Sequence, residues 1–183
     1  MQYRKLTPEE ILKTKKLAKE VRKLPRTPIY GVLDNIRSLY NVGAMFRTAD
    51  GIMAEKLYLC GMTGMPPRRE IDKTSLGACD TVPWEYKKTS LEAIKELKEK
   101  GVQIVALELT EPSVHFTELS CDFPAALVVG HEIDGVSDEA MKYIDTAISI
   151  PMLGRANSLN VATAFGIAVY QMLDVYMKKQ PRK

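Results

Sequence analysis

The sequence has few of the residues from which disulfide frameworks and metal sites are built. Its 183 residues include three cysteines and two histidines, and no two cysteines form a C-x-x-C pair. This pattern favours neither a zinc site nor a disulfide framework and is typical of a reducing compartment. No apolar run approaches the roughly 18–20 residues of a membrane-spanning helix, and the charged first thirty residues lack a signal-peptide core. We therefore expect a cytoplasmic protein with no metal and no membrane attachment.

The glycine pattern of dinucleotide-binding folds is also missing. A G-x-G-x-x-G sequence would follow the first strand of such a fold and begin its first helix. The first apolar strand candidate spans residues 29–33, and the nearest glycines are Gly31 and Gly43. A conventional nicotinamide-dependent dehydrogenase is therefore poorly supported.

The length and the hydrophobic content suit one domain, but charge is unevenly distributed. Hydrophobic residues make up 45% of the chain, enough for a sizeable core. The net charge is +3, yet residues 1–26 contain nine Lys or Arg and three Glu, and residues 178–183 contain four basic residues and no acidic one. Two basic terminal segments on either side of a mildly acidic central segment suggest an extended anionic partner, most commonly nucleic acid. Solvated termini without a partner have the same composition, so this alternative stays open.

Apolar runs alternate with helical patterns along the chain. Residues 7–24 predict an amphipathic helix, because Thr7 suits the N-cap and Pro8 the first helical position. We therefore divide the chain into a basic helical extension, residues 1–26, and a main domain, residues 27–183.

The main domain is expected to alternate strands and helices. Strands are expected at residues 29–33, 56–60, 102–109, 125–130 and 146–150. Helices are expected at residues 41–53, 89–101 and 161–177, and the stretch 61–84, rich in Gly, Pro and charge, is expected to be mostly loop. This alternation predicts an α/β domain with a largely parallel, Rossmann-like sheet.

Three polar stretches fall near expected strand ends, where open α/β sheets bind ligands. The first is DNIRSLYNVGAMFRTAD, residues 34–50. Asn41 is expected to cap the following helix, which places Arg47 about two turns further along. Gly43 permits a close backbone approach. The simpler alternative is a capped helix with an arginine on its surface.

The second stretch is GHEIDG, residues 130–135, directly after a buried strand. Gly130 lets the backbone touch a ligand, and Glu132 is placed either to bind a ligand or to brace a loop. His131 is expected to be incidental, since the chain has one other histidine, His115, and no partner arrangement for a metal.

The third stretch is IPMLGRANSLNV, residues 150–161, between an expected strand and the last helix. Asn157 or Ser158 is expected to cap that helix. The helix is apolar on nearly every side, which predicts burial all round. At a chain end, such burial often means that a partner subunit covers the outer face.

Taken together, the three stretches closely resemble the SpoU/TrmH family of RNA ribose methyltransferases, within the SPOUT superfamily. Three motifs of that family occur here in the family order, over roughly residues 29–172, and KTSLGA at 73–78 resembles a further family loop. Two positions differ: Ala162 stands where the family often has Ser, and Gln171 where it often has Glu. Both differences mark a subgroup and affect no residue assigned to chemistry.

The resemblance implies a SPOUT fold, in which the C-terminal segment passes through an earlier loop to form a deep trefoil knot. General topology rules disfavour knots, so this expectation comes from the family alone. The resemblance also implies that the knot loops form a pocket for S-adenosylmethionine, the expected cofactor. The implied cofactor-binding residues are Leu107, Gly130, Ile150, Met152, Ser158 and Leu159.

The implied reaction moves a methyl group from S-adenosylmethionine to a ribose 2′-hydroxyl without a metal. The implied catalytic residues are Arg47, Asn41, Glu132, Asn160 and Ser158. A guanidinium group is a poor base because it stays protonated, so Arg47 is expected to bind a phosphate or stabilise the developing alkoxide. Asn41 and Asn160 are expected to orient Arg47 and the ribose, and Glu132 to brace the site.

The expected partners are structured RNA and a second copy of the chain, because the family is dimeric with its RNA site at the subunit interface. A short basic extension in place of a separate RNA-binding domain resembles the subgroup that acts on tRNA. The expected RNA-binding residues are Arg47, Arg68, Arg69 and Lys73, although Arg68 and Arg69 equally suit a solvated loop. The alternatives are a methyltransferase acting on rRNA and a catalytically idle RNA-binding protein with this fold.

Overall fold

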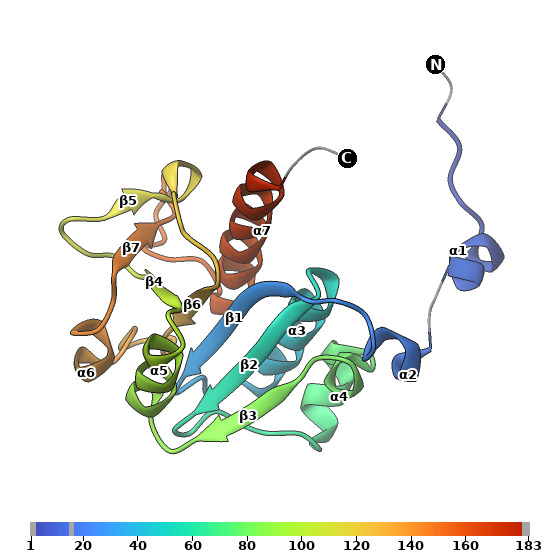
Figure 1. Cartoon of the computed structure of the whole chain (residues 1–183), viewed down its shortest axis with the longest axis horizontal. Coiled ribbons are helices and arrows are strands. Elements are labelled where there is room, and N and C mark those ends of the chain that lie inside the picture. The colour runs from blue at the N-terminus through green and yellow to red at the C-terminus, as the bar shows by residue number, and fades with distance from the viewer. Residues whose placement is uncertain (1–2, 15–16, 181–183) are drawn as a thin grey trace.

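The computed structural model describes residues 3–14 and 17–180. Lys15, Lys16, Arg182 and Lys183, which belong to the basic ends of the sequence, lie outside these ranges. Figure 1 shows one sheet with helices on both of its faces. No helix in the described parts of the chain is long and apolar enough to cross a membrane.

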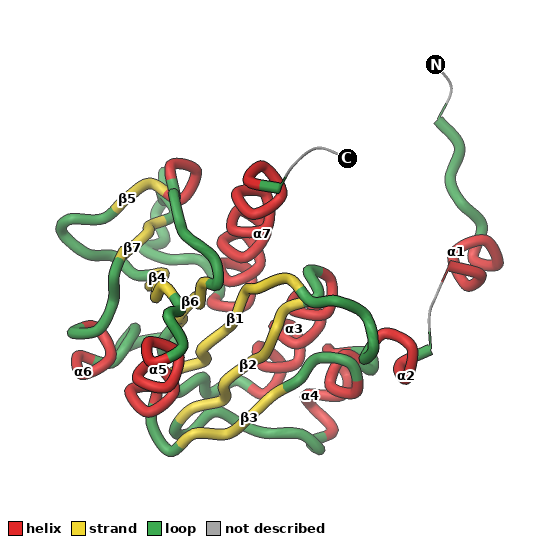
Figure 2. Tube along the Cα trace, in the orientation of Figure 1, coloured by secondary structure: helices red, strands yellow, loops and turns green. Residues whose placement is uncertain are grey.

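The sheet has seven strands in the order β3-β2-β1-β6-β4-β7-β5, and the pairings between neighbouring strands are parallel. Its strands are β1 (Thr27–Asp34), β2 (Ala54–Cys60), β3 (Trp84–Lys87), β4 (Gln103–Leu107), β5 (Val114–His115), β6 (Ala125–Val129) and β7 (Thr146–Ser149). At the centre, Val32 of β1 lies opposite Tyr58 of β2 and Val128 of β6. The predicted parallel α/β sheet is confirmed. Figure 2 marks its strands in yellow and the helices in red.

Helices cover the sheet on two faces because successive strand residues point to opposite sides. The helices are α1 (Pro8–Thr14), α2 (Ala18–Val21), α3 (Leu39–Gly51), α4 (Arg69–Ser75), α5 (Ser90–Glu99), α6 (Asp138–Met141) and α7 (Val161–Lys179), with 3-10 turns η1 (Ala78–Asp80) and η2 (Phe116–Glu118). On one face of the sheet, Leu33 and Leu127 belong to a hydrophobic cluster that also contains residues of α3 and α7. On the other face, Val32 and Val128 belong to a second hydrophobic cluster that also contains residues of α5 and α6.

The stretch 61–84 is less irregular than its composition predicts. It contains α4 and η1, and β3 begins at its last residue, Trp84. The elements β5 and α6, which have two and four residues, are also not predicted from the sequence. Elements this short span only about one period of an apolar pattern, which is too little for periodicity to identify them. The strand expected at 102–109 ends at Leu107, which leaves Glu108 in the loop that follows.

The N-terminal extension forms two short helices rather than the single helix expected at 7–24. Thr7 caps α1 as predicted: the Glu10 amide donates to its hydroxyl at 3.2 Å, and the Glu10 carboxylate accepts from the Thr7 amide at 2.7 Å. The described residues of α1 and α2 include no buried side chain, and α1 stands apart from the sheet in Figure 1. The extension contacts the main domain through Arg22, whose guanidinium donates to the Asp80 carbonyl, and through Arg26, whose guanidinium donates to the Ala54 carbonyl at 2.9 Å.

The last helix, α7, is buried on one face only. Phe165, Val169 and Met172 are at most 1% exposed, whereas Tyr170 is 52% and Met177 64% exposed. Burial all round, as the composition of the helix predicts, is therefore wrong for a single chain. The apolar outer face is instead left partly open.

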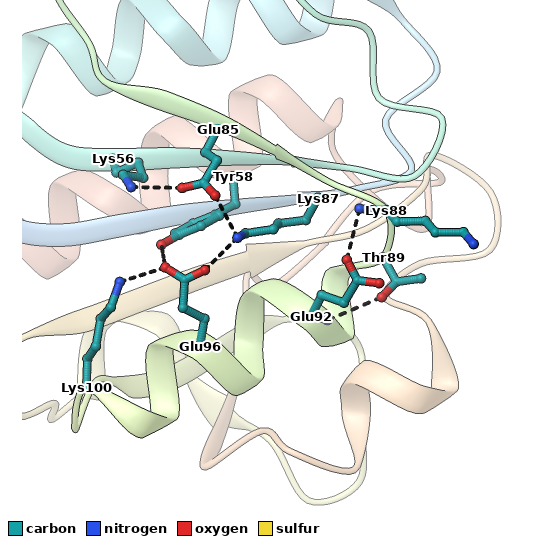
Figure 3. Close-up of polar contacts among 9 residues, drawn as sticks. All are labelled: Lys56, Tyr58, Glu85, Lys87, Lys88, Thr89, Glu92, Glu96 and Lys100. Atoms are coloured by element: carbon teal, nitrogen blue, oxygen red, sulfur yellow. Dashed lines mark hydrogen bonds and ion pairs between the residues drawn. The ribbon is translucent and has the colours of Figure 1, made fainter.

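A charged cluster joins β2, β3 and α5 on the far side of the sheet from α7 (Figure 3). The Tyr58 hydroxyl donates to Glu96 at 2.8 Å, and the Lys87 ammonium lies 2.6 Å from carboxylate oxygens of both Glu85 and Glu96. Hydrogen bonds from Lys100, Lys87 and Tyr58 lower the pKa of Glu96 to about 2, against the opposing effect of burial. The cluster thus attaches the short edge strand β3 to α5.

Candidate active site

A cavity of about 570 Å³ opens at the carboxyl ends of β4, β6 and β7, where parallel sheets commonly bind ligands. Its walls come from these strand ends and from the start of α7. The six residues predicted to bind the cofactor all line it: Leu107, Gly130, Ile150, Met152, Ser158 and Leu159. Three loops from different parts of the sequence thus meet around one space, as the resemblance implies.

The GHEIDG stretch forms a closed turn. The His131 amide donates to the Gly135 carbonyl at 2.9 Å, and the Gly135 amide donates back to the His131 carbonyl at 3.0 Å. A Cβ atom at Gly130 would overlap the backbone of Gly135 and Val136, and Gly135 itself has a φ of +71°. Both glycines are therefore required by the turn itself. The His131 ring lies inside the turn, where its Nδ1 accepts from the Ile133 and Asp134 amides.

Glu132 braces the turn against the start of α3. Its carboxylate accepts from the amides of Arg37 at 3.1 Å and Ser38 at 3.2 Å, and from the Asn41 side chain at 3.0 Å. Burial raises the pKa of Glu132, but these hydrogen bonds outweigh it, so the pKa lies below its ordinary value of 4.5. Of the two roles left open for Glu132, the structure shows the brace.

Asn41 and Asn160 continue the same network to α7. The Asn160 side-chain amide donates to the Asn41 side-chain oxygen at 3.1 Å. The Asn160 oxygen accepts from the amides of Ala162 at 3.0 Å and Thr163 at 3.3 Å, so Asn160 is the N-cap of α7. Glu132, Asn41 and Asn160 therefore connect all three polar stretches.

Two predicted helix caps are wrong. Ser38 rather than Asn41 caps α3, because its hydroxyl accepts from the Asn41 amide at 3.3 Å. Asn160 rather than Asn157 or Ser158 caps α7. Several polar residues precede each helix, and any of them suits a cap, so local sequence cannot choose among them. The exposed Ser158 is left at the cavity wall.

Arg47 lies apart from this cavity. It is exposed on α3, six residues beyond Asn41, which is about 9 Å along a helix that rises about 1.5 Å per residue. It lines a second hollow of about 520 Å³ together with Lys73 and Thr74 of α4 and Tyr170 of α7. Within the described chain, Arg47 is therefore not in contact with the predicted cofactor site.

The helix α4 brings further basic side chains to this hollow. Gly43 allows α4 to pack closely on α3, since a Cβ atom there would collide with the Ile71 carbonyl and the Thr74 hydroxyl. Lys73 of α4 shares the hollow with Arg47, and Arg68 and Arg69 are exposed at the start of the helix. The predicted RNA-binding residues thus come from α3, α4 and the residue before α4.

Two acidic residues at strand ends contribute to the site and are not predicted from the sequence. Asp34 is 1% exposed and accepts from the Ser137 amide at 2.9 Å and the Ser137 hydroxyl at 2.7 Å. Glu108 lines the cavity and accepts from the Val136 amide at 2.9 Å. In the sequence, each could have been recognised as an acidic residue at the end of an apolar run: Asp34 ends β1, and Glu108 follows β4.

The cysteines are free thiols. Burial raises the pKa of Cys121 to about 11, so this thiol stays protonated at neutral pH. Within residues 3–14 and 17–180, no three His, Cys, Asp or Glu side chains are grouped so as to hold a metal ion.

The brace at Glu132 predicts a pH-dependent loss of stability in Glu132→Gln. Because folding lowers the pKa of Glu132 from about 4.5, the ionised carboxylate stabilises the folded chain above that pH, and this contribution disappears as the pH falls through the lowered pKa. We expect urea unfolding near pH 7 to show a loss on the order of 1 kcal/mol, which shrinks in acid.

The matched control is Glu139→Gln, which changes an exposed carboxylate on the nearby α6. It should leave the free energy of unfolding within about 0.5 kcal/mol of the wild type. A Glu132→Gln deficit that stays constant down to pH 3 would contradict the assigned role.

Sequence and structure both relate the chain to RNA methyltransferases. The model of the SpoU rRNA Methylase family matches residues 28–170. The tRNA (guanosine(18)-2'-O)-methyltransferase of Aquifex aeolicus is 37% identical over 138 residues, which are 75% of this chain. The chain spans 65% of the length of that relative.

Solved structures show the same similarity. The A. aeolicus TrmH/SpoU tRNA modifying enzyme superposes with a TM-score of 0.79 at 33% identity, over 93% of this chain and 85% of that one. The AdoMet-bound rRNA methyltransferase from Sinorhizobium meliloti superposes with a TM-score of 0.75 at 28% identity, over 88% of this chain and 61% of that one. Since the family model covers residues 28–170, the chain belongs to the SpoU rRNA Methylase family.

Proposed function

We propose that the chain is an S-adenosylmethionine-dependent methyltransferase that modifies a ribose 2′-hydroxyl of tRNA. One observation carries the proposal: all six residues expected to bind the cofactor line a single cavity beside the Glu132–Asn41–Asn160 network. Relatives named as tRNA 2′-O-methyltransferases and an AdoMet-bound structural relative support the same reaction and cofactor.

The cavity suits the proposed cofactor in size and chemistry. Its volume of about 570 Å³ falls within the range of roughly 300–1,000 Å³ typical of small-molecule sites. Leu107, Ile150, Met152 and Leu159 offer apolar walls, and the turn from Gly130 offers backbone groups. When bound, S-adenosylmethionine supplies a methyl group activated by a positively charged sulfur.

The network residues are proposed to position the reacting groups. Asn41 and Asn160 are neutral amides bonded to each other, and Glu132 uses its oxygens on backbone amides and on Asn41. The two neutral amides cannot take a proton from a hydroxyl, and the carboxylate of Glu132 already accepts three hydrogen bonds. They hold the turn and the start of α7 around the cavity, and alignment of this kind supplies several kcal/mol in transfer reactions.

Arg47 is proposed to bind a phosphate of the RNA and to stabilise the developing alkoxide. Its guanidinium stays protonated and can form paired hydrogen bonds with phosphate oxygens. Lys73 in the same hollow adds a second positive charge. A phosphate of the RNA itself is proposed to assist removal of the hydroxyl proton, because the guanidinium of Arg47 stays protonated.

We further propose a homodimer that covers the outer face of α7. Two observations support it: this face is apolar and partly open, and Arg47 lies in a hollow shared with Tyr170 of α7 rather than in the cavity of its own chain. A second copy is therefore the natural way to bring an arginine to each cavity.

The proposed trefoil knot is supported by the position of α7 relative to an earlier loop. After β7, the chain returns to pack α7 against the segment between β5 and β6. There Gln171 donates to the Thr117 carbonyl at 3.5 Å, and Lys179 donates to the Cys121 carbonyl at 2.8 Å. A crystal structure traced through residues 110–180 would test the threading directly.

Residues 1–26 are proposed to hold RNA phosphates as a basic extension of the domain that follows. The first strand begins at Thr27, and the extension contains nine basic residues. Arg68, Arg69 and Lys73 are exposed and are proposed to continue this surface. Contacts of this type hold RNA without reading its sequence.

Transfer of labelled methyl from S-adenosylmethionine to unmodified tRNA and rRNA pools tests the proposed function. We expect label as a 2′-O-methylnucleoside in tRNA and its loss with Asn160→Ala, which removes the link to Asn41 and the cap of α7. Label in rRNA alone would contradict tRNA as the substrate and would favour the rRNA methyltransferase alternative. Bound cofactor without label in either pool would favour the idle RNA-binding alternative.

Arg47→Lys tests the proposed role of the guanidinium. Lysine keeps the charge but cannot form a paired contact with phosphate, so we expect turnover to fall by about 10- to 100-fold. The affinity for S-adenosylmethionine should stay unchanged, because Arg47 does not line the cavity. Near-normal turnover at saturating tRNA would rule out a paired contact.

A further inference from the structure

Glu108 lies where the cavity meets the GHEIDG turn. It directly follows β4 and lines the cavity. One carboxylate oxygen accepts from the Leu109 amide at 2.9 Å, and the other accepts from the Val136 amide at 2.9 Å. A Cβ atom at Gly135 would collide with this carboxylate, so the turn backbone rests directly on it. The side chain is therefore held in a fixed position at the cavity wall.

The charge of the cavity wall has one sign. Its charged residues are Glu108, Glu132 and Asp134, and none of the described residues that line it is Lys or Arg. Glu132 uses its oxygens on the start of α3, while the side chain of Asp134 is 81% exposed, so that solvent screens its charge.

Glu108 accepts two hydrogen bonds where Glu132 accepts three, and like Glu132 it has no cationic partner among the described residues. Its hydrogen bonds come from neutral backbone amides, and it takes part in none of the ion pairs between described residues. Each carboxylate oxygen has two acceptor positions, so one bond per oxygen leaves capacity to interact with a ligand. A carboxylate without a cationic partner at the wall of a cavity attracts a cation placed there.

We propose that Glu108 is a specificity-determining residue, whose carboxylate favours a sulfonium ligand over the neutral thioether that remains after methyl transfer. The inference rests on the proposed function. In the transfer, the carbon–sulfur bond of the methyl group breaks, the sulfur keeps the electron pair, and a bond from the ribose oxygen to the methyl carbon forms. The hydroxyl proton leaves with the assistance of the RNA phosphate proposed above. The cofactor thereby loses one positive charge, while its shape changes by one methyl group.

The consequence is a site that holds its substrate cofactor more tightly than its product. Attraction to Glu108 acts on the cationic ligand and is lost when the charge is lost. The exchange of used for fresh cofactor is therefore favoured by the charge of the wall, without a movement of the loops.

Glu108→Gln tests the proposal by calorimetric titration with S-adenosylmethionine and S-adenosylhomocysteine. Glutamine has nearly the same shape, and its oxygen can still accept from the Val136 amide. We expect the affinity for S-adenosylmethionine to fall about tenfold and that for S-adenosylhomocysteine to change less than about twofold. Equal weakening of both ligands would reduce Glu108 to a support of the turn and would overturn the proposal.

Two variants serve as controls. Glu108→Asp keeps the charge on a shorter side chain and should retain the preference for the cation within about threefold. Glu111→Gln removes an exposed carboxylate three residues away that does not line the cavity, and it should leave the ratio of the two affinities unchanged. A matching shift in Glu111→Gln would assign the preference to overall charge rather than to Glu108, and would overturn the proposal.

The wild-type chain supplies a test that needs no variant. An analogue with a protonated amine in place of the sulfonium should bind more tightly than S-adenosylhomocysteine. If the thioether binds as tightly as both cations, selection by charge is wrong although the cavity still binds the cofactor. If no ligand of this class binds, the proposed function itself fails.

Discussion

Four hydrogen bonds join loops that lie far apart in the sequence. Glu132, after β6, accepts from the amides of Arg37 and Ser38 and from the Asn41 side chain, and Asn160 donates to Asn41. The cavity depends on these contacts, because it is the space that the loops leave at the carboxyl ends of β4, β6 and β7. Each bond contributes only about 1 kcal/mol. The loops are therefore held by the network as a whole and not by any single bond.

This arrangement separates two tasks that the proposed reaction requires. The cavity side is apolar and acidic, with neutral amides already bonded to each other, so it suits binding and alignment of a cationic cofactor. The basic side is the hollow of Arg47 and Lys73, which suits RNA phosphate. In the proposed dimer, the open face of α7 brings these two halves together. Catalysis then depends on geometry and charge more than on a titrating base.

The buried strands were predictable because a parallel strand covered on both faces is a continuous apolar run. Residues 125–130 show this directly: the five residues of β6 are all buried. The helix caps were misplaced because several polar residues precede each helix. Glu108 was missed because the strand expected at residues 102–109 included it, whereas β4 ends at Leu107. The Asn160–Asn41 bond joins residues 119 positions apart, and no local pattern contains such a pairing. The site was located by three ordered motifs and their resemblance to a family.

Amide hydrogen exchange, measured with and without S-adenosylmethionine, tests most directly whether the three loops form the cofactor site. The account predicts slower exchange in residues 107–109, 130–137 and 150–160, which contain most of the residues that line the cavity, and no change around Arg47. Protection that is confined to the hollow of Arg47 and Lys73 would contradict it, as would cofactor binding that leaves all three loops unchanged.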